Sequence, residues 1–143
     1  MKRFRFIVFC LIFGLASASS FAADFVVVAN PKVAEDSVSK SELKHIYMIN
    51  QTNWKNGEKI TIVVLSPEGA GADDLTREYM SMSAIQAKKY WLIKVFNGVL
   101  PSLPIVVDTA DEAIEKVLAT KGAIAIVPKA TKVGKAKVLS ETP

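Results

Sequence analysis

A glycine-rich segment, SPEGAGADDLTREYM (residues 66–80), joins an apolar stretch to a sequence typical of a helix. Its glycines allow backbone N–H groups to converge at the first turn of that helix, where such groups bind anions. A plain turn between a strand and a helix would contain the same glycines. If the segment binds a ligand, we expect the contacts to be backbone N–H groups together with one hydroxyl, that of Ser66. The candidate ligand-binding residues are Ser66, Gly69, Ala70, Gly71 and Ala72.

The chain offers little material for catalysis. A hydrolase needs a nucleophile with a base, a pair of carboxylates or a metal cluster. His45 is the only histidine, and it lies beside Ile46 and Tyr47 in a helical pattern typical of a structural imidazole. Asp73 and Asp74 fall in the first turn of a helix, where the helix dipole favours acidic residues. We therefore expect a protein that is not an enzyme, with no cofactor and no metal ion.

The start of the chain has the composition of a secretory signal peptide. Basic residues precede a nearly continuous apolar run at residues 6–15, and small residues follow. The apolar run is shorter than the roughly 20 residues that a membrane-spanning helix needs. We expect a signal peptide over residues 1–22 and cleavage before Ala23. One mature domain over residues 23–143 would then lie in the periplasm or be secreted.

The charge of the chain argues against a nucleic-acid partner. Three of its 18 basic residues lie in the predicted signal peptide, and without them the basic residues exceed the 14 acidic residues by one. A nearly neutral domain lacks the basic surface that nucleic-acid binding requires. Cys10, the only cysteine, also lies in the signal peptide, so the mature domain forms no disulfide.

Three helix starts are predicted by a Ser or Thr followed three residues later by Glu or Gln, the capping-box pattern. The pairs are Ser39 with Glu42, Ser83 with Gln86, and Thr109 with Glu112. The helix after Ser83 presents Ile85, Leu92 and Phe96 along one face and ends at Asn97 and Gly98. A fourth helix is expected over residues 73–81.

Short runs rich in Val and Ile alternate with these helices and predict strands. The runs cover residues 25–29, 60–65, 105–107, 123–127 and 136–139. Continuous apolar runs suit strands that are covered on both faces. The expected fold class is therefore α/β, a three-layer sandwich around a mostly parallel sheet.

The order of these motifs resembles the ligand-binding lobe of the periplasmic phosphate-binding proteins of ABC transporters, and in particular short single-lobe relatives. The similar motifs are LKHIYMINQTNW, ITIVVLSPEGAGADDLTREYM, MSMSAIQAKKYWLIKVFNG and KGAIAIV, which start at residues 43, 60, 80 and 121. The resemblance implies one lobe of a type II periplasmic binding protein. It also implies binding or sensing of phosphate or another small anion, with an ABC permease as partner.

The glycine-rich segment departs from the family's Asp-Gly-Ser-Gly-Thr loop. Glu68 stands at the Asp, Ala70 at the Ser and Ala72 at the Thr, while the Arg that precedes the loop falls on Leu65 or Ser66. Two hydroxyl groups and a guanidinium are therefore missing. Because each hydrogen bond to a charged group contributes about 1.5–3 kcal/mol, phosphate binding is expected to be weak.

A second function stays open beside anion binding. A mature chain of this length makes one lobe, so the two-walled cleft of full-length family members cannot form within one copy. The alternative is a ligand-free interaction module that docks on a membrane or envelope protein. A second copy of the chain, giving a homodimer, is the other partner expected for such a module.

Overall fold

A computed structural model describes residues 25–143. The predicted signal peptide, with Cys10 and the cleavage site before Ala23, lies outside the described residues. In order along the described chain, the elements are β1 (Phe25–Ala29), β2 (Ser37–Ser39), α1 (Lys40–Tyr47), β3 (Thr61–Leu65), α2 (Ala72–Met80), α3 (Ala84–Phe96), β4 (Ile105–Val107), α4 (Ala110–Ala119), β5 (Ala123–Pro128) and β6 (Lys137–Thr142). None of these helices is long and apolar enough to cross a bilayer.

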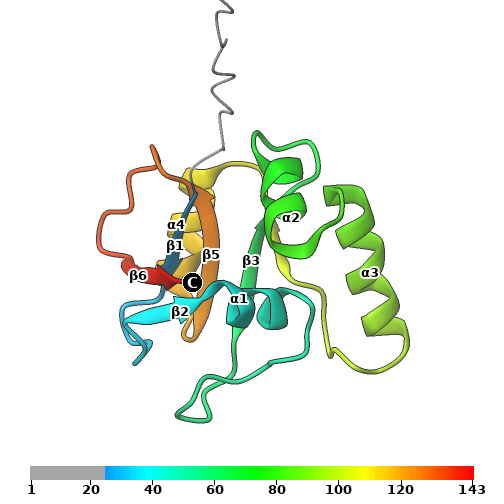
Figure 1. Ribbon diagram of the computed structural model, residues 1–143, viewed down its shortest axis with the longest axis horizontal. Helices are drawn as coiled ribbons and strands as arrows, with labels where there is room; N and C mark the ends of the chain where they lie inside the picture. Colours follow the sequence, from blue (N-terminus) through cyan, green and yellow to red (C-terminus); the bar gives the residue numbers. More distant parts are fainter. Residues whose placement is uncertain (1–24) are drawn as a thin grey trace, which may run out of the picture.

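The strands form one mixed sheet in the order β2-β6-β1-β5-β3-β4 (Figure 1). The pairs β2 with β6, β5 with β3, and β3 with β4 are parallel. β1 is antiparallel to both of its neighbours, since Val27 pairs with Ile126 of β5 and with Leu139 of β6. The predicted α/β class with a mostly parallel sheet is therefore confirmed.

Helices cover both faces of the sheet and give the three layers (Figure 1). On one face the side chains of α1, α2 and α3, among them Leu43, Ile46, Leu75, Tyr79 and Trp91, pack on strand residues such as Val27, Ile62 and Ile124. On the other face Ile114 and Val117 of α4 pack on Val28, Val63 and Ala125. Strands buried on both faces explain the continuous apolar runs in the sequence.

All three predicted helix starts are present, because each rests on a local hydrogen bond between a side chain and the backbone. The hydroxyls of Ser39, Ser83 and Thr109 each accept from the N–H three residues later. Only at Ser83 is the box reciprocal, with Gln86 Oε1 accepting from the Ser83 N–H at 2.9 Å.

The other two predicted boxes are wrong in their second half, because each glutamate is used elsewhere. Glu42 Oε1 accepts from Gln51 Nε2 at 3.1 Å, which ties α1 to the segment that follows it. Glu112 Oε2 accepts from the N–H of Asp108 at 3.0 Å, one residue before the cap. The serine or threonine alone fixes the start of these two helices.

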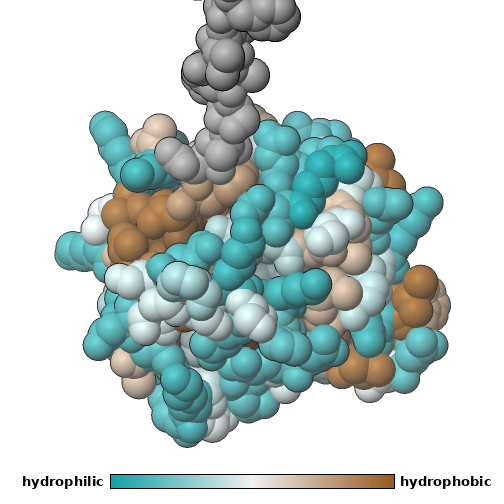
Figure 2. Space-filling model, viewed as in Figure 1, coloured by the Kyte–Doolittle hydropathy of each residue, from teal (hydrophilic) through white to brown (hydrophobic). Residues whose placement is uncertain are grey.

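The apolar face predicted for α3 is not its buried face. Ile85 and Phe96 are 59% and 87% exposed, whereas Ala84, Ala87 and Trp91 are buried. α3 packs mainly on α2, and the indole N–H of Trp91 donates to the carbonyl of Tyr47 at 2.8 Å. This buried bond sets the rotation of the helix. Figure 2 shows apolar atoms at the surface on the right-hand side, where α3 lies.

β2 was not predicted from the sequence. It has only three residues, too few for an alternating pattern, and it exists because Ser37 pairs with Ser140 of β6. Its last residue, Ser39, is at the same time the N-cap of α1.

Candidate functional site

The predicted anion site lies at the carboxyl end of β3, where residues 66–72 form two consecutive β-turns. The carbonyl of Ser66 accepts from the Gly69 N–H at 2.8 Å, and the carbonyl of Gly69 accepts from the Ala72 N–H at 3.2 Å. Pro67 occupies the second position of the first turn, which its fixed φ favours. Gly71, with φ 82° and ψ −3°, has the conformation that the third position of a type II turn requires. The local sequence therefore accounts for both turns.

A glycine is needed at position 69 because two backbone carbonyl groups lie close to it, and not because its φ is positive. A Cβ at this position would lie 3.0 Å from the carbonyl oxygen of Ser66 and 3.2 Å from that of Asp108. The loop thus packs against the end of β4, one strand across. Gly71 lies on the other side, where a Cβ would be 3.7 Å from Pro128 at the end of β5. The turns are held between the ends of two strands.

The two turns decide which backbone donors are available to a ligand. Gly69 and Ala72 use their N–H groups inside the turns, so these two predicted contacts are engaged. The N–H groups of Ala70 and Gly71 form no hydrogen bond with any described residue. They precede α2 directly, where the partial positive charge of a helix N-terminus lies. Of the four N–H groups of residues 69–72, only those of Ala70 and Gly71 lack a hydrogen-bond partner among the described residues.

The side chains of the loop add little to these donors. Ala72 is 2% exposed and Ser66 is 9% exposed, so both belong to the packed interior rather than to an open surface. Ala70 is exposed and Glu68 beside it is also exposed. No Lys or Arg occurs between residues 66 and 72. The loop consequently has the backbone form of an anion site without a cationic side chain of its own.

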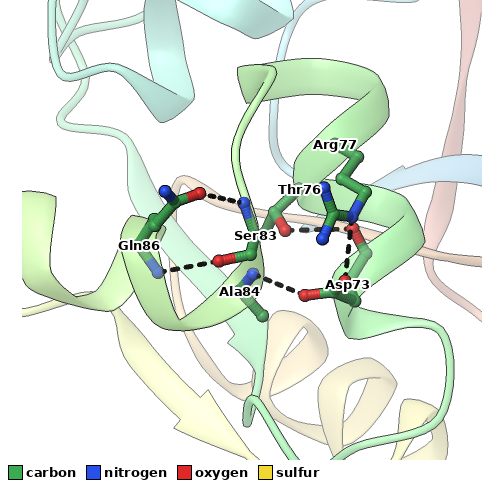
Figure 3. Close-up of polar contacts among 6 residues, drawn as sticks. All are labelled: Asp73, Thr76, Arg77, Ser83, Ala84 and Gln86. Carbon is green, nitrogen blue, oxygen red and sulfur yellow. Dashed lines mark hydrogen bonds and ion pairs between the residues drawn. The ribbon is translucent and has the colours of Figure 1, made fainter.

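The acidic charge of Asp73 is engaged in linking α2 to α3 (Figure 3). Its Oδ1 accepts from the N–H of Ala84 at 2.9 Å, and its Oδ2 pairs with Arg77 Nε at 2.9 Å. The hydrogen bond from Ala84 and the contact with Arg77 hold the pKa of Asp73 below its usual range. Asp73 thus serves the start of α3, at Ser83 and Gln86, more than the loop before it.

Other candidate chemistry is limited in the part of the chain that the structure describes. His45 is exposed on α1. Residues 25–143 contain no group of three or more His, Cys, Asp or Glu side chains arranged to hold a metal ion. Trp54 and Trp91 are core residues, and each indole N–H donates to a backbone carbonyl. Neither tryptophan presents an open face to a ligand.

A feature that the sequence did not predict lies at the opposite end of β3. Two adjoining cavities of about 190 and 260 Å³ share six lining residues, which we call the Ile49 groove. These residues are Ile49, Lys59, Ile60, Ile62, Leu100 and Pro101. The one signal in the sequence is that an isoleucine follows the end of α1, at a position where glycine is usual.

Several solved structures are similar to this chain, among them three proteins whose names refer to phosphate transport or to PstS. An ABC-type phosphate transport receptor from Vibrio cholerae has a TM-score of 0.59 at 16% identity. A putative phosphate ABC transporter substrate-binding protein with bound phosphate from Clostridium perfringens has a TM-score of 0.61 at 16% identity. PstS from Borrelia burgdorferi has a TM-score of 0.57 at 19% identity. No protein-family model and no curated protein sequence matches the chain.

These similarities show the fold of the chain. Each alignment covers 82% of this chain, which therefore has the fold of phosphate ABC transporter substrate-binding proteins. The chain spans less than half of each of those proteins, between 44% and 47% of their length. By their descriptions, the first neighbour is a phosphate transport receptor and the second a putative substrate-binding protein of a phosphate transporter.

Proposed function

We propose that this protein is an exported solute-binding-protein-like domain that binds phosphate or another small anion weakly. The contact is made by residues 66–72, through the N–H groups of Ala70 and Gly71. The observation that carries the proposal is that both donors lack a partner among residues 25–143, in a loop at the carboxyl end of a parallel strand and directly before a helix. Ligands of open α/β sheets bind at this end of the strands.

Weak binding follows from the small number of donors. A micromolar site corresponds to about −8.2 kcal/mol and a millimolar site to about −4.1 kcal/mol. Two neutral N–H donors that contact an anion supply about 3–6 kcal/mol together, and the entropy lost on association reduces this sum, so the net affinity is expected in the millimolar range. Export and a periplasmic location belong to the same proposal. An ABC permease or another envelope protein is its expected partner.

The test is a titration with inorganic phosphate, followed by the amide NMR signals of Ala70 and Gly71. Both signals should shift and approach saturation in the millimolar range. Ala70→Pro removes one donor at the second position of a type II turn, where proline is accepted, and should weaken binding. Ala70→Ser adds a hydroxyl at the exposed loop position and should strengthen it. Unchanged loop signals at saturating phosphate would contradict the proposal, as would micromolar binding.

The second candidate function is a ligand-free module that docks on an envelope protein. One observation favours it: Ile85, Ile93 and Phe96 of α3 are large apolar side chains with more than half of their surface exposed. Such residues gathered on one helix are typical of contact surfaces. Replacing Phe96 with Ser should then reduce capture of the partner from the native envelope while leaving the phosphate titration unchanged.

A further inference from the structure

The Ile49 groove lies where the sheet is incomplete. β4 pairs with β3 only from Val63 onward, opposite Ile105. The Thr61 N–H donates to the carbonyl of Gly122 on the β5 side, at 3.2 Å. Because successive N–H groups of a strand point to opposite sides, the N–H of Ile62 points to the side where β4 has not begun. At the floor of the groove, the backbone of Ile62 therefore has an N–H group that faces no paired strand.

The walls of the groove are two loops that the helices hold in place. After α1, Ile49 donates to the carbonyl of Ile46 at 3.0 Å, and Asn50 donates to that of His45 at 2.8 Å. This is a Schellman motif, which requires a left-handed residue, and Ile49 has φ 62°. A β-branched residue rarely adopts this conformation, and such strain is concentrated at functional sites.

The second wall follows the same motif at the end of α3. Gly98, with φ 72°, donates to Val95, and Val99 donates to Lys94. The chain then runs through Leu100 and the following prolines back to β4, along the open edge of β3.

The charge and polarity of the residues that line the Ile49 groove indicate which kind of ligand it can bind. Within the described part of the chain, Lys59 is the only charged residue that lines the two cavities, and no carboxylate lines them. Lys59 forms no ion pair with a described residue. The uncharged polar residues Thr61 and Ser102 line one cavity and Gln51, Thr52 and Asn53 line the other, and the rest of the lining is mainly apolar. A bare phosphate would lose its hydration there without enough partners.

We propose that the Ile49 groove binds a small organic carboxylate with an apolar body. The body would lie against Ile49, Ile60 and Leu100, with the carboxylate at the Lys59 ammonium. An engineered cavity of about 150 Å³ holds benzene, so each of these cavities accepts roughly six to ten non-hydrogen atoms. The site is separate from residues 66–72 and does not depend on phosphate binding there.

The experiment uses the mature protein and three linear carboxylates: butanoate, hexanoate and octanoate. Their binding is followed by the backbone and methyl NMR signals of Ile49, Ile62 and Leu100. Each buried methylene should tighten binding about fourfold until the cavity is full. Hexan-1-ol serves as the neutral probe of matched length. Inorganic phosphate should leave these signals unchanged, whatever it does at Ala70 and Gly71.

Two variants separate the charge from the cavity. Lys59→Gln should weaken hexanoate binding about two- to fivefold, the size of an exposed ion pair, and leave hexan-1-ol binding unchanged. Lys55→Gln removes an exposed lysine that does not line the groove, and it should change neither. If no carboxylate shifts the groove signals, the proposal is wrong. It is equally wrong if hexanoate and hexan-1-ol bind alike and Lys59→Gln has no effect.

Discussion

Gly122 and Lys59 are packed backbone to backbone, and a Cβ on Gly122 would overlap the carbonyl oxygen of Lys59. Gly122 also has φ 72°, and its own carbonyl accepts from the Trp54 indole N–H at 3.0 Å. The turn before β5, the start of β3 and a core tryptophan therefore meet at one glycine.

Gly122→Ala should destabilise the domain strongly, and Gly57→Ala provides the matched control. Both glycines have a positive φ, but a Cβ on Gly57 would meet nothing within 4 Å. Alanine in this conformation costs about 1–2 kcal/mol at either site. Overpacking against Lys59 should add about 1–3 kcal/mol at Gly122 alone. Urea midpoints measure the difference, and equal effects of the two substitutions would contradict the close contact.

Asp73→Asn should lower stability near neutral pH, with a smaller effect in acid. The hydrogen bond from Ala84 and the contact with Arg77 lower the pKa of Asp73 in the folded state. Its contribution is complete above the unfolded-state value of about 3.9 and is lost as the pH falls through the lower folded-state pKa. The urea midpoints of wild type and variant should therefore converge as the pH falls below about 4. Asp74→Asn is the matched control: it removes the same charge from the same helix turn but neither of these two contacts, so it should cost less stability near neutral pH.

Ser83→Ala should cost about 0.5–2 kcal/mol, as expected for the loss of an N-cap. Gln86→Ala removes the return bond to the Ser83 N–H, and the two changes together should cost less than the sum of their separate effects. A thermodynamic cycle of the four proteins in urea measures this coupling. Additive effects would show that the two bonds of the box form independently.

Trp91→Phe should destabilise the domain by about 1–3 kcal/mol, because it leaves the buried carbonyl of Tyr47 without its donor. Tyr90→Phe removes a similar bond, from the phenol to the carbonyl of Met48 at 2.6 Å, where the site is only partly buried. Water can replace that donor, so the smaller effect is expected for Tyr90. Denaturant midpoints compare the two, and the reverse order would contradict the assigned burial.

Export predicts a mature chain that begins at or near Ala23. Intact-mass measurement of the protein from its native envelope tests this directly. A full-length chain held in the membrane fraction would show that residues 1–22 are not a cleaved signal peptide.

The features that could be predicted from the sequence are those that depend on contacts between residues close together in the chain. Helix starts at Ser39, Ser83 and Thr109 depend on atoms three residues apart, so the pattern found all three. The buried face of α3 depends instead on its packing against α2 and on the Tyr47 carbonyl of α1, which accepts from the Trp91 indole N–H. Neither partner lies within the sequence window around Phe96. An apolar stripe shows where burial is favourable, but a distant partner decides which stripe is buried.

For the two candidate sites too, features set by neighbouring residues could be predicted from the sequence, and features set by distant residues could not. The glycine pattern predicted the turns at residues 66–72. It could not show that Gly69 and Ala72 use their N–H groups inside the turns, while those of Ala70 and Gly71 have no partner among the described residues. The Ile49 groove could not be predicted, because its walls come from segments about 50 residues apart and its floor from a strand that pairs elsewhere.

The pairing of β1 also fixes an order of events in folding. Val27 finds its partners only in Ile126 and Leu139, so the middle of the sheet closes a loop that includes almost the whole described chain. Pairings this distant slow folding, since the entropy of the loop is lost before the contacts form. While the chain is being made, β1 has no strand to join until β5 and β6 have followed it. The sheet of such a nascent chain can therefore be completed only after its last two strands have been made.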